Sequence, residues 1–150
     1  MNIDRLVNAG AMPTLEAVAQ FSARRHELIA HNIANISTPN FQHKDVPVEH
    51  FQETLGDAID ERRKQTGGFH GELNLPRSRQ IRQLRDASGQ ARLHLNPTSN
   101  GGSVLYHDRN NRDIEHLMQS LSENTAAFRT ATELFKSRIG LIREAIALRV

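Results

Sequence analysis

Histidine is the residue of this chain best suited to bind a metal or transfer a proton, and the sequence has eight. A zinc site on a helix uses two histidines four positions apart and a third ligand. No two histidines here have that spacing, and neither His43 with His50 nor His107 beside Asp108 completes a site. The sequence has no Cys, which removes thiolate ligands and disulfides. We therefore predict no metal site and no cofactor.

The hydroxyls and carboxylates show no arrangement typical of an enzyme. A hydrolase needs a nucleophile held against a base and an orienting acid, or two positioned carboxylates. The sequence contains no local signature of either arrangement. We therefore predict no catalytic residues, no small-molecule substrate and no enzymatic activity.

Arginines gather near the centre of the chain, where they could neutralise phosphates. Between residues 61 and 94, eight Lys or Arg stand against three Asp or Glu, a local net charge of +5, and the rest sums to −3. The run Arg77, Arg79, Arg82 and Arg85 could bind nucleic acid by counterion release, but no aromatic residue is interleaved to stack on bases. A helical nucleic-acid-binding or regulatory protein using this arginine-rich connector stays the alternative, and a solvated or subunit-facing charged loop is favoured.

The composition fits one domain, or an elongated unit that partners complete. Of the 150 residues, 37% are hydrophobic, with no Trp, one Tyr and six Phe. Few apolar side chains are available for a private core, which indicates burial against another chain. The first residues lack the features of a cleaved signal peptide, and no run of about 18 apolar residues occurs. Any export is therefore expected to leave the N-terminus uncleaved.

Proline and glycine divide the chain into three parts. Seven of the nine Gly and three of the five Pro fall between residues 41 and 111, and residues 112–150 contain one Gly and no Pro. We predict an N-terminal helix and turn in residues 1–40, a loop-rich, poorly packed connector over 41–111, and a long helix over 112–150. Short alternating runs at 73–75 and 93–95 are candidates for a small hairpin within the connector.

The C-terminal part has the clearest periodicity. Apolar residues recur there every seven positions, at Ile114, Leu121, Phe128, Phe135 and Ile142. Leu117 and Ile139 extend the same face, and a helix over 112–148 would be on the order of 55 Å long. A strict seven-residue period favours coiled-coil packing, although an ordinary helical bundle uses the same spacing. Asn124 and Arg138 suit a simple two-stranded pair poorly.

A second helix is predicted from about Thr14 to Asn35, with Thr14 as its cap after Pro13. One face of it carries apolar residues at Leu15, Val18, Ile29 and Ile33. The residue before Pro39 is driven away from helical angles, and Asn40 can adopt the left-handed conformation. The helix is therefore expected to stop there.

Residues 32–41 read Asn-Ile-Ala-Asn-Ile-Ser-Thr-Pro-Asn-Phe. This string resembles the signature of the flagellar rod, hook and hook-associated protein family, in which a helix ends in an Ala-Asn-x-x-Thr-Pro-Gly-Tyr-like turn. The matching turn positions are Ala34, Asn35, Thr38, Pro39, Asn40 and Phe41. Asn40 replaces the usual Gly at modest cost, because Asn tolerates the same backbone region.

The entry to the C-terminal helix carries a second match. Residues 110–115 read Asn-Asn-Arg-Asp-Ile-Glu and resemble the family's Asn-Asn-x-Asp-x-Glu pattern at Asn110, Asn111 and Asp113. Arg109 and Arg112 replace the usual Gly and apolar residue. The short length, the stretch at 21–30 and the small middle are most similar to the proximal members of the flagellar basal-body rod family.

This resemblance implies a mainly α subunit whose terminal helices pair as a coiled coil, with an irregular or small-β connector between them. The implied partners are other flagellar rod subunits, further copies of the chain and the membrane-embedded ring at the rod base, without nucleic acid or small-molecule substrate. The implied location is the flagellar basal body in the periplasmic space, after export without a cleaved signal, and the implied role is torque transmission. The subunit-packing seam would comprise Leu15, Val18, Ile29, Ile33, Ile114, Leu117, Leu121, Phe128, Phe135, Ile139 and Ile142.

Overall fold

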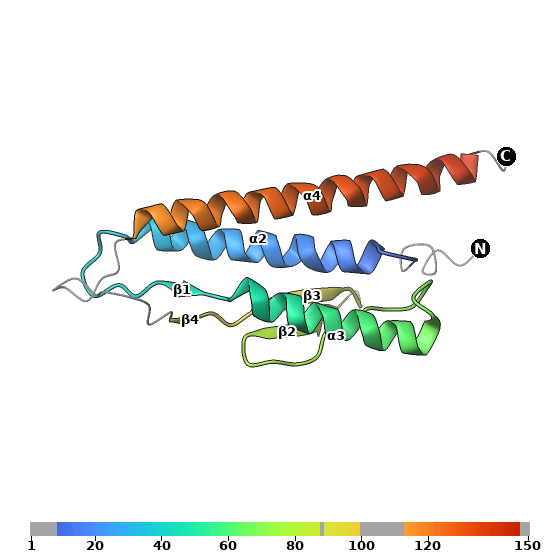
Figure 1. Ribbon diagram of the computed structural model, residues 1–150, viewed down its shortest axis with the longest axis horizontal. Helices are drawn as coiled ribbons and strands as arrows, with labels where there is room; N and C mark the ends of the chain where they lie inside the picture. The colour runs from blue at the N-terminus through green and yellow to red at the C-terminus, as the bar shows by residue number, and fades with distance from the viewer. Residues whose placement is uncertain (1–8, 88, 100–112, 148–150) are drawn as a thin grey trace.

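A computed structural model describes residues 9–87, 89–99 and 113–147, and helices dominate it. Its helices lie roughly along one long axis, with α2 between α4 and α3, and α2 and α4 run in opposite directions (Figure 1). The helices span α2 Met12–Ala34, α3 Val48–Thr66 and α4 Ile114–Ala147. The strands span β1 Lys44–Asp45, β2 Ile81–Arg85, β3 Ala91–Leu95 and β4 Thr98–Ser99. The predicted mainly α fold with a small-β connector is confirmed.

Helix α2 begins two residues earlier than predicted. Pro13 lies in its first turn, where the missing backbone N–H has no intrahelical partner to lose, and Ala11 occupies the cap position without a side-chain hydrogen bond. The prediction that Thr14 caps the helix is therefore wrong, because Thr14 lies inside it. At the other end the turn is as expected, with Asn40 in the left-handed region at φ 59°.

Helix α3 lies inside the segment that was expected to be loop-rich, and that expectation is wrong over Val48–Thr66. Phe51, Leu55 and Ala58 are buried at spacings of four and three residues, which places them on one helical face. Apart from Val48, Gly56 and Ile59, the rest of the helix is charged and polar, so its short apolar face gave only a weak periodic signal. The helix ends at Gly67, whose φ of 68° is the left-handed conformation common at helix C-termini.

The hairpin β2–β3 uses one predicted strand and one that was not predicted. Strand β3 contains the expected run 93–95, and it pairs antiparallel with β2, with Gln83 opposite Leu93. The run 73–75 is not a strand. The side chain of Gln83 binds its backbone instead, accepting from the Leu75 N–H at 2.8 Å and donating to the Leu73 carbonyl at 3.0 Å. A side-chain amide thus replaces a strand neighbour.

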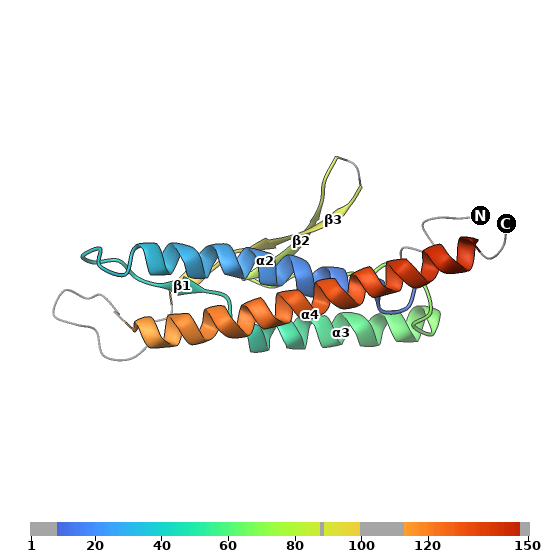
Figure 2. The same cartoon turned by 90° about the horizontal axis from the view of Figure 1, so that it is seen from above.

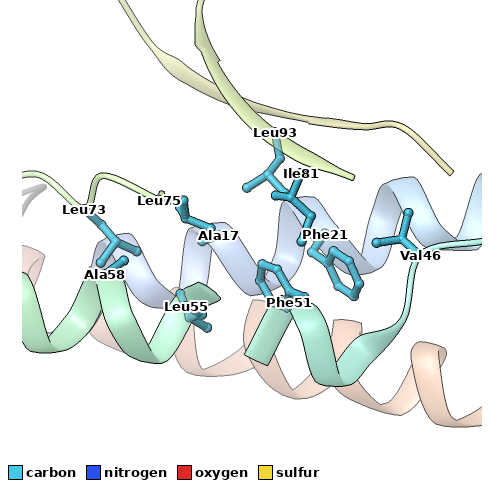
Figure 3. Packing of buried hydrophobic residues seen from close by; sticks show 10 residues of the cluster. All are labelled: Ala17, Phe21, Val46, Phe51, Leu55, Ala58, Leu73, Leu75, Ile81 and Leu93. Atoms are coloured by element: carbon cyan, nitrogen blue, oxygen red, sulfur yellow. The ribbon is translucent and has the colours of Figure 1, made fainter. Parts of the chain in front are cut away.

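The hydrophobic core lies between α2, α3 and the hairpin (Figure 3). Phe21 and Phe51 stack across it with ring centroids 4.0 Å apart and planes 2° from parallel. The residues of the core cluster are Ala17, Phe21, Val46, Phe51, Leu55, Ala58, Leu73, Leu75, Ile81 and Leu93. Eight of these ten come from residues 41–111. The expectation of a poorly packed connector is therefore wrong, because the connector covers one side of α2 with its own apolar residues.

Candidate subunit-packing surface

Two polar side chains on the buried side of α2 hold strand β1 in place. The buried Asn32 donates through Nδ2 to the Lys44 carbonyl at 2.8 Å and accepts from the Lys44 N–H at 3.2 Å. Arg25 forms a bidentate ion pair with Asp45, at 3.0 and 2.7 Å, with side chains only 8% and 20% exposed. These contacts were not predicted from the sequence. Their signal was the spacing of Arg25, Ile29 and Asn32, which places polar residues on the apolar face of a helix.

The predicted turn motif forms a compact reversal at the end of α2. Asn35 donates through Nδ2 to the His31 carbonyl at 2.9 Å, and its own carbonyl accepts from the Thr38 N–H at 3.0 Å. Phe41 is half-buried, with its ring centroid 5.5 Å from that of His31 and 5.7 Å from that of His43. Ala34, Thr38, Pro39 and Asn40 are exposed. The motif therefore shapes the backbone and presents most of its side chains to the surroundings.

The start of α4 is capped by the acidic residue of the second motif. Asp113 accepts a hydrogen bond from the His116 N–H at 2.9 Å, as an N-cap carboxylate does. Asn110 and Asn111 lie outside the described residues. His43 lies near this helix start, because the charges of Asp113 and His116 both act on it. Its Nε2 atom is buried and has no hydrogen-bond partner among the described residues. Burial lowers the pKa of His43, and Asp113 partly opposes that effect.

Helices α2 and α4 pack along a line of mostly small and polar residues. Leu117, Ser120, Asn124 and Ala131 of α4 are buried. The amide of Asn124 donates to the Ser22 carbonyl of α2 at 2.8 Å. Of the predicted seam positions on α2, Ile29 is buried, and Leu15, Val18 and Ile33 are half-buried. The α4 residues that face α2 thus include positions 117, 124 and 131, which recur every seven residues. They lie beside the predicted stripe that contains Ile114, Leu121 and Phe128.

That recurrent stripe lies at the margin of the α2 contact. Ile114 and Phe128 are exposed at 40% and 38%, and the half-buried positions are Leu121, Phe135, Ile139 and Ile142. Met118, 47% exposed, lies on the same side of the helix. We call Ile114, Met118, Leu121 and Phe128 the outer edge of α4. This edge carries large apolar side chains that α2 only partly covers.

The far half of α4 extends beyond α2. Asn124 of α4 lies opposite Ser22 of α2. Because the two helices are antiparallel, Leu134, ten residues after Asn124, lies about level with Met12, the first residue of α2. Figure 1 shows α4 continuing past the described start of α2. Leu134, Leu141 and Ile146 in this overhang are 51%, 55% and 42% exposed. The overhang is therefore amphipathic, and the described part of α2 does not cover it.

A groove of about 430 Å³ lies where α2, α3 and α4 meet, and residues of all three helices line it. Its lining combines apolar side chains, including Val18, Phe51 and Leu55, with polar ones, including Glu49 and Glu123. In residues 9–87, 89–99 and 113–147 there is no group of three His, Asp or Glu side chains placed to hold a metal ion. The groove thus offers a concave surface with a mixed apolar and polar lining.

The connector arginines do not act as one group. Arg85 pairs with Glu72, and this hydrogen bond lowers the pKa of the Glu72 carboxyl. Arg92 pairs with Asp86 at 3.0 Å. Arg77, Arg79 and Arg82 are exposed. The strands of the hairpin that carries several of them contain no Phe, Tyr or Trp, and His94 is their one ring that could stack on a base.

None of the helices in the described ranges is long and apolar enough to cross a membrane. The most distinctive surface is accordingly the partly covered apolar face of α4, together with the turn and the cap at its near end. No protein-family model matches the chain, and no curated protein sequence is significantly similar to it.

Proposed function

We propose that this chain is a structural subunit of the proximal rod of the bacterial flagellar basal body and works by packing helices against neighbouring subunits. The observation that carries the proposal is the apolar surface on α4 that the described residues cover only in part, on the outer edge and on the overhang. The resemblance at residues 34–41 and 110–115 supplies the family. Both matched segments lie at the ends of the two helices that would do the packing.

The energetics favour covering this surface. Full burial of a large apolar side chain stabilises by about 1.5–3 kcal/mol relative to leaving it in water. Several such residues on one long helix therefore give a substantial driving force for association. Their seven-residue recurrence suits a coiled coil, in which α2, α4 and helices of neighbouring subunits interlock. Because mostly small and polar residues of α4 face α2, the larger apolar residues of α4 remain available for those neighbours.

The geometry of such an assembly follows from the asymmetry of the chain. A contact between two different surfaces of identical or related subunits repeats without closing when the rotation does not complete a ring, and so builds a helical tube. The rod subunits and the ring at the rod base are the partners in this proposal, and the periplasmic space is the location. Torque then passes through packed helices, without a reacting residue.

Phe128→Asp tests the proposal directly. A carboxylate on the outer edge would face an apolar neighbour in the assembly, where an unpaired buried charge costs several kcal/mol. Phe128 is 38% exposed in the isolated chain, so losing its partial burial should cost the monomer about 1–2 kcal/mol, which urea unfolding measures separately from assembly. Thr130→Asp is the matched control, because it adds the same charge to an exposed position on another side of α4.

The readout is swimming motility and recovery of the protein in isolated basal bodies, in the source bacterium with its own copy of the gene deleted. We expect the deletion to abolish swimming, Thr130→Asp to restore it and Phe128→Asp to fail. A deletion strain that swims normally, or a Phe128→Asp protein recovered in basal bodies at the normal amount, would refute the proposal.

A further inference from the structure

The outer face of the β2–β3 hairpin is cationic and carries one exposed leucine. The strand register places Arg82 opposite His94 and Leu84 opposite Arg92, all four on the face away from the buried Ile81 and Leu93. Leu84 is 52% exposed. Arg82 has no ion pair among the described residues, and neither has Arg79 just before the strand. Arg92 on this face pairs with Asp86. The face therefore places the exposed Leu84 beside Arg82, whose charge has no counter-ion among the described residues.

The exposed face of α3 has the complementary character. Positions 49, 53, 56 and 60 lie in one stripe along the helix, and Asp57 adjoins it. This stripe carries Glu49, Glu53 and Asp60, all exposed, around Gly56, and Asp60 pairs with the exposed Arg63 at 3.4 Å. A Cβ built on Gly56 would meet no atom within 4 Å, so packing within the chain does not require glycine there. Glycine in a helix interior costs about 1 kcal/mol relative to alanine. Its effect on the surface is a notch between carboxylates.

The two faces cannot meet within one chain. In Figure 2 the hairpin projects from one side of α2, and α3 lies along the other side. The inner face of the hairpin is held to α2, because Gln20 donates to the Ala91 carbonyl at 3.1 Å and accepts from the Leu93 N–H at 2.9 Å. A hairpin tied to α2 in this way is not free to swing round to the outer face of its own α3.

We propose that the hairpin of one copy docks on α3 of a second copy, with Leu84 seated at Gly56 and the arginines among the carboxylates. The contact joins different surfaces of the two copies, so it is heterologous and propagates along a row. It uses neither α4 nor the terminal motifs. The inference thus goes beyond the proposed rod function and stands independently of it.

Charge and shape together favour a second copy over a polyanion such as nucleic acid. A phosphate backbone would neutralise Arg79 and Arg82 but would leave Leu84 against a charged, hydrated surface. The α3 face offers both counter-charges and, at Gly56, an exposed position without a side chain over which an apolar residue can lie. Opposite potentials on the two faces also steer encounter, with a strong dependence on ionic strength.

The test is sedimentation velocity of the full chain with charge-reversed variants. Glu53→Lys/Asp57→Lys reverses the acidic face, and Arg79→Glu/Arg82→Glu reverses the basic face without disturbing the paired Arg85 and Arg92. We expect self-association of the unaltered chain at low salt, and an association constant at least about tenfold lower for each variant alone. An equimolar mixture of the two variants should recover association. The unaltered hairpin of the acidic-face variant meets the unaltered α3 of the basic-face variant, and the two reversed faces are again opposite in charge.

A matched control reverses two charges elsewhere. Glu133→Lys/Glu144→Lys changes the net charge as much as the acidic-face variant does, at exposed positions of α4, and should leave this association unchanged. Gly56→Leu fills the notch. We expect it to weaken association at least about tenfold while keeping or raising the Tm of the monomer, because leucine is the better helix former.

The proposal is overturned if the unaltered chain stays monomeric at low salt, if the mixture of reversed variants fails to associate, or if Gly56→Leu associates normally. Salt-sensitive binding of DNA by the unaltered chain, with no self-association, would assign the basic face to a polyanion instead. Repeating the mixture experiment with Phe128→Asp in both variants separates the two proposals. Recovery in that background shows a hairpin contact that does not need the outer edge of α4.

Discussion

The Nδ2 atom of Asn124 in α4 donates a hydrogen bond to the carbonyl oxygen of Ser22 in α2, at 2.8 Å and out of contact with solvent. The bond joins residues 102 positions apart in sequence. A buried amide within a packed helix contact fixes the register of the two helices, because any shift leaves it unpaired. This bond therefore sets how far α4 extends past the start of α2.

Asn124→Asp should destabilise the helix pair at neutral pH. The carboxylate would be desolvated and would face a carbonyl oxygen, so we expect a loss of about 2–4 kcal/mol at pH 7. Its pKa in the folded state would be raised above the unfolded value of about 3.9. The stability of the variant should therefore approach that of the unaltered protein below the unfolded pKa. It should fall behind as pH rises through the folded pKa. Urea unfolding of both proteins across the acid range measures this, with Ser122→Asp on the exposed side as control. Parallel pH profiles would contradict the prediction.

Arg25→Met should cost roughly 3 kcal/mol of unfolding free energy, because it leaves the Asp45 carboxylate unpaired where both partners are largely buried. The double variant Arg25→Met/Asp45→Asn should recover a large part of that loss, since an Asn oxygen can still accept from the Val46 N–H. Arg24→Met is the neighbouring control. It removes an ion pair with Glu27 whose side chains are 50% and 66% exposed, and should cost less than about 1 kcal/mol. Equal losses for Arg24 and Arg25 would refute the assignment.

His43 should make folding sensitive to mild acid. Burial lowers its pKa in the folded state, so the unfolded chain takes up the proton first. Its contribution to stability is present above the unfolded pKa of about 6.5 and is lost as pH falls through the lower folded pKa. His43→Phe, which keeps a ring beside Phe41, should flatten the fall in unfolding free energy between neutral and weakly acidic pH. The exposed His26→Gln should leave it unchanged. An unaltered slope in His43→Phe would show that other groups cause it.

The turn residue Asn40 should tolerate glycine and reject branched side chains. Its φ of 59° suits Gly at least as well as Asn, so Asn40→Gly is expected to change stability by only a few tenths of a kcal/mol. Asn40→Val should lose about 1–3 kcal/mol, because a β-branched residue is strained in this region. Thermal unfolding with Ser37→Val as control measures both. A loss for Ser37→Val as large as that for Asn40→Val would refute backbone strain as the cause.

The sequence alone was sufficient for features that depend on residues close together in the chain. The period of α4, the stop of α2 near Pro39 and the left-handed Asn40 all follow from local sterics and side-chain spacing. The cap at Asp113 is also local, although the sequence had indicated that residue only as part of the entry to the helix. The presence of a long amphipathic helix with more apolar surface than one partner covers could therefore be predicted.

Only the tertiary structure decided which side of that helix is covered. The seven-residue recurrence indicated the stripe that contains Phe128. In the structure α2 instead contacts the neighbouring positions Leu117 and Asn124, because the Ser22 carbonyl of α2 accepts a hydrogen bond there. Helix α3 and the notch at Gly56 were likewise missed. The apolar face of α3 is short, and its burial depends on Phe21, thirty residues before Phe51 in the chain. Local patterns determine which elements form, but contacts between residues distant in sequence determine which faces remain free to bind a partner.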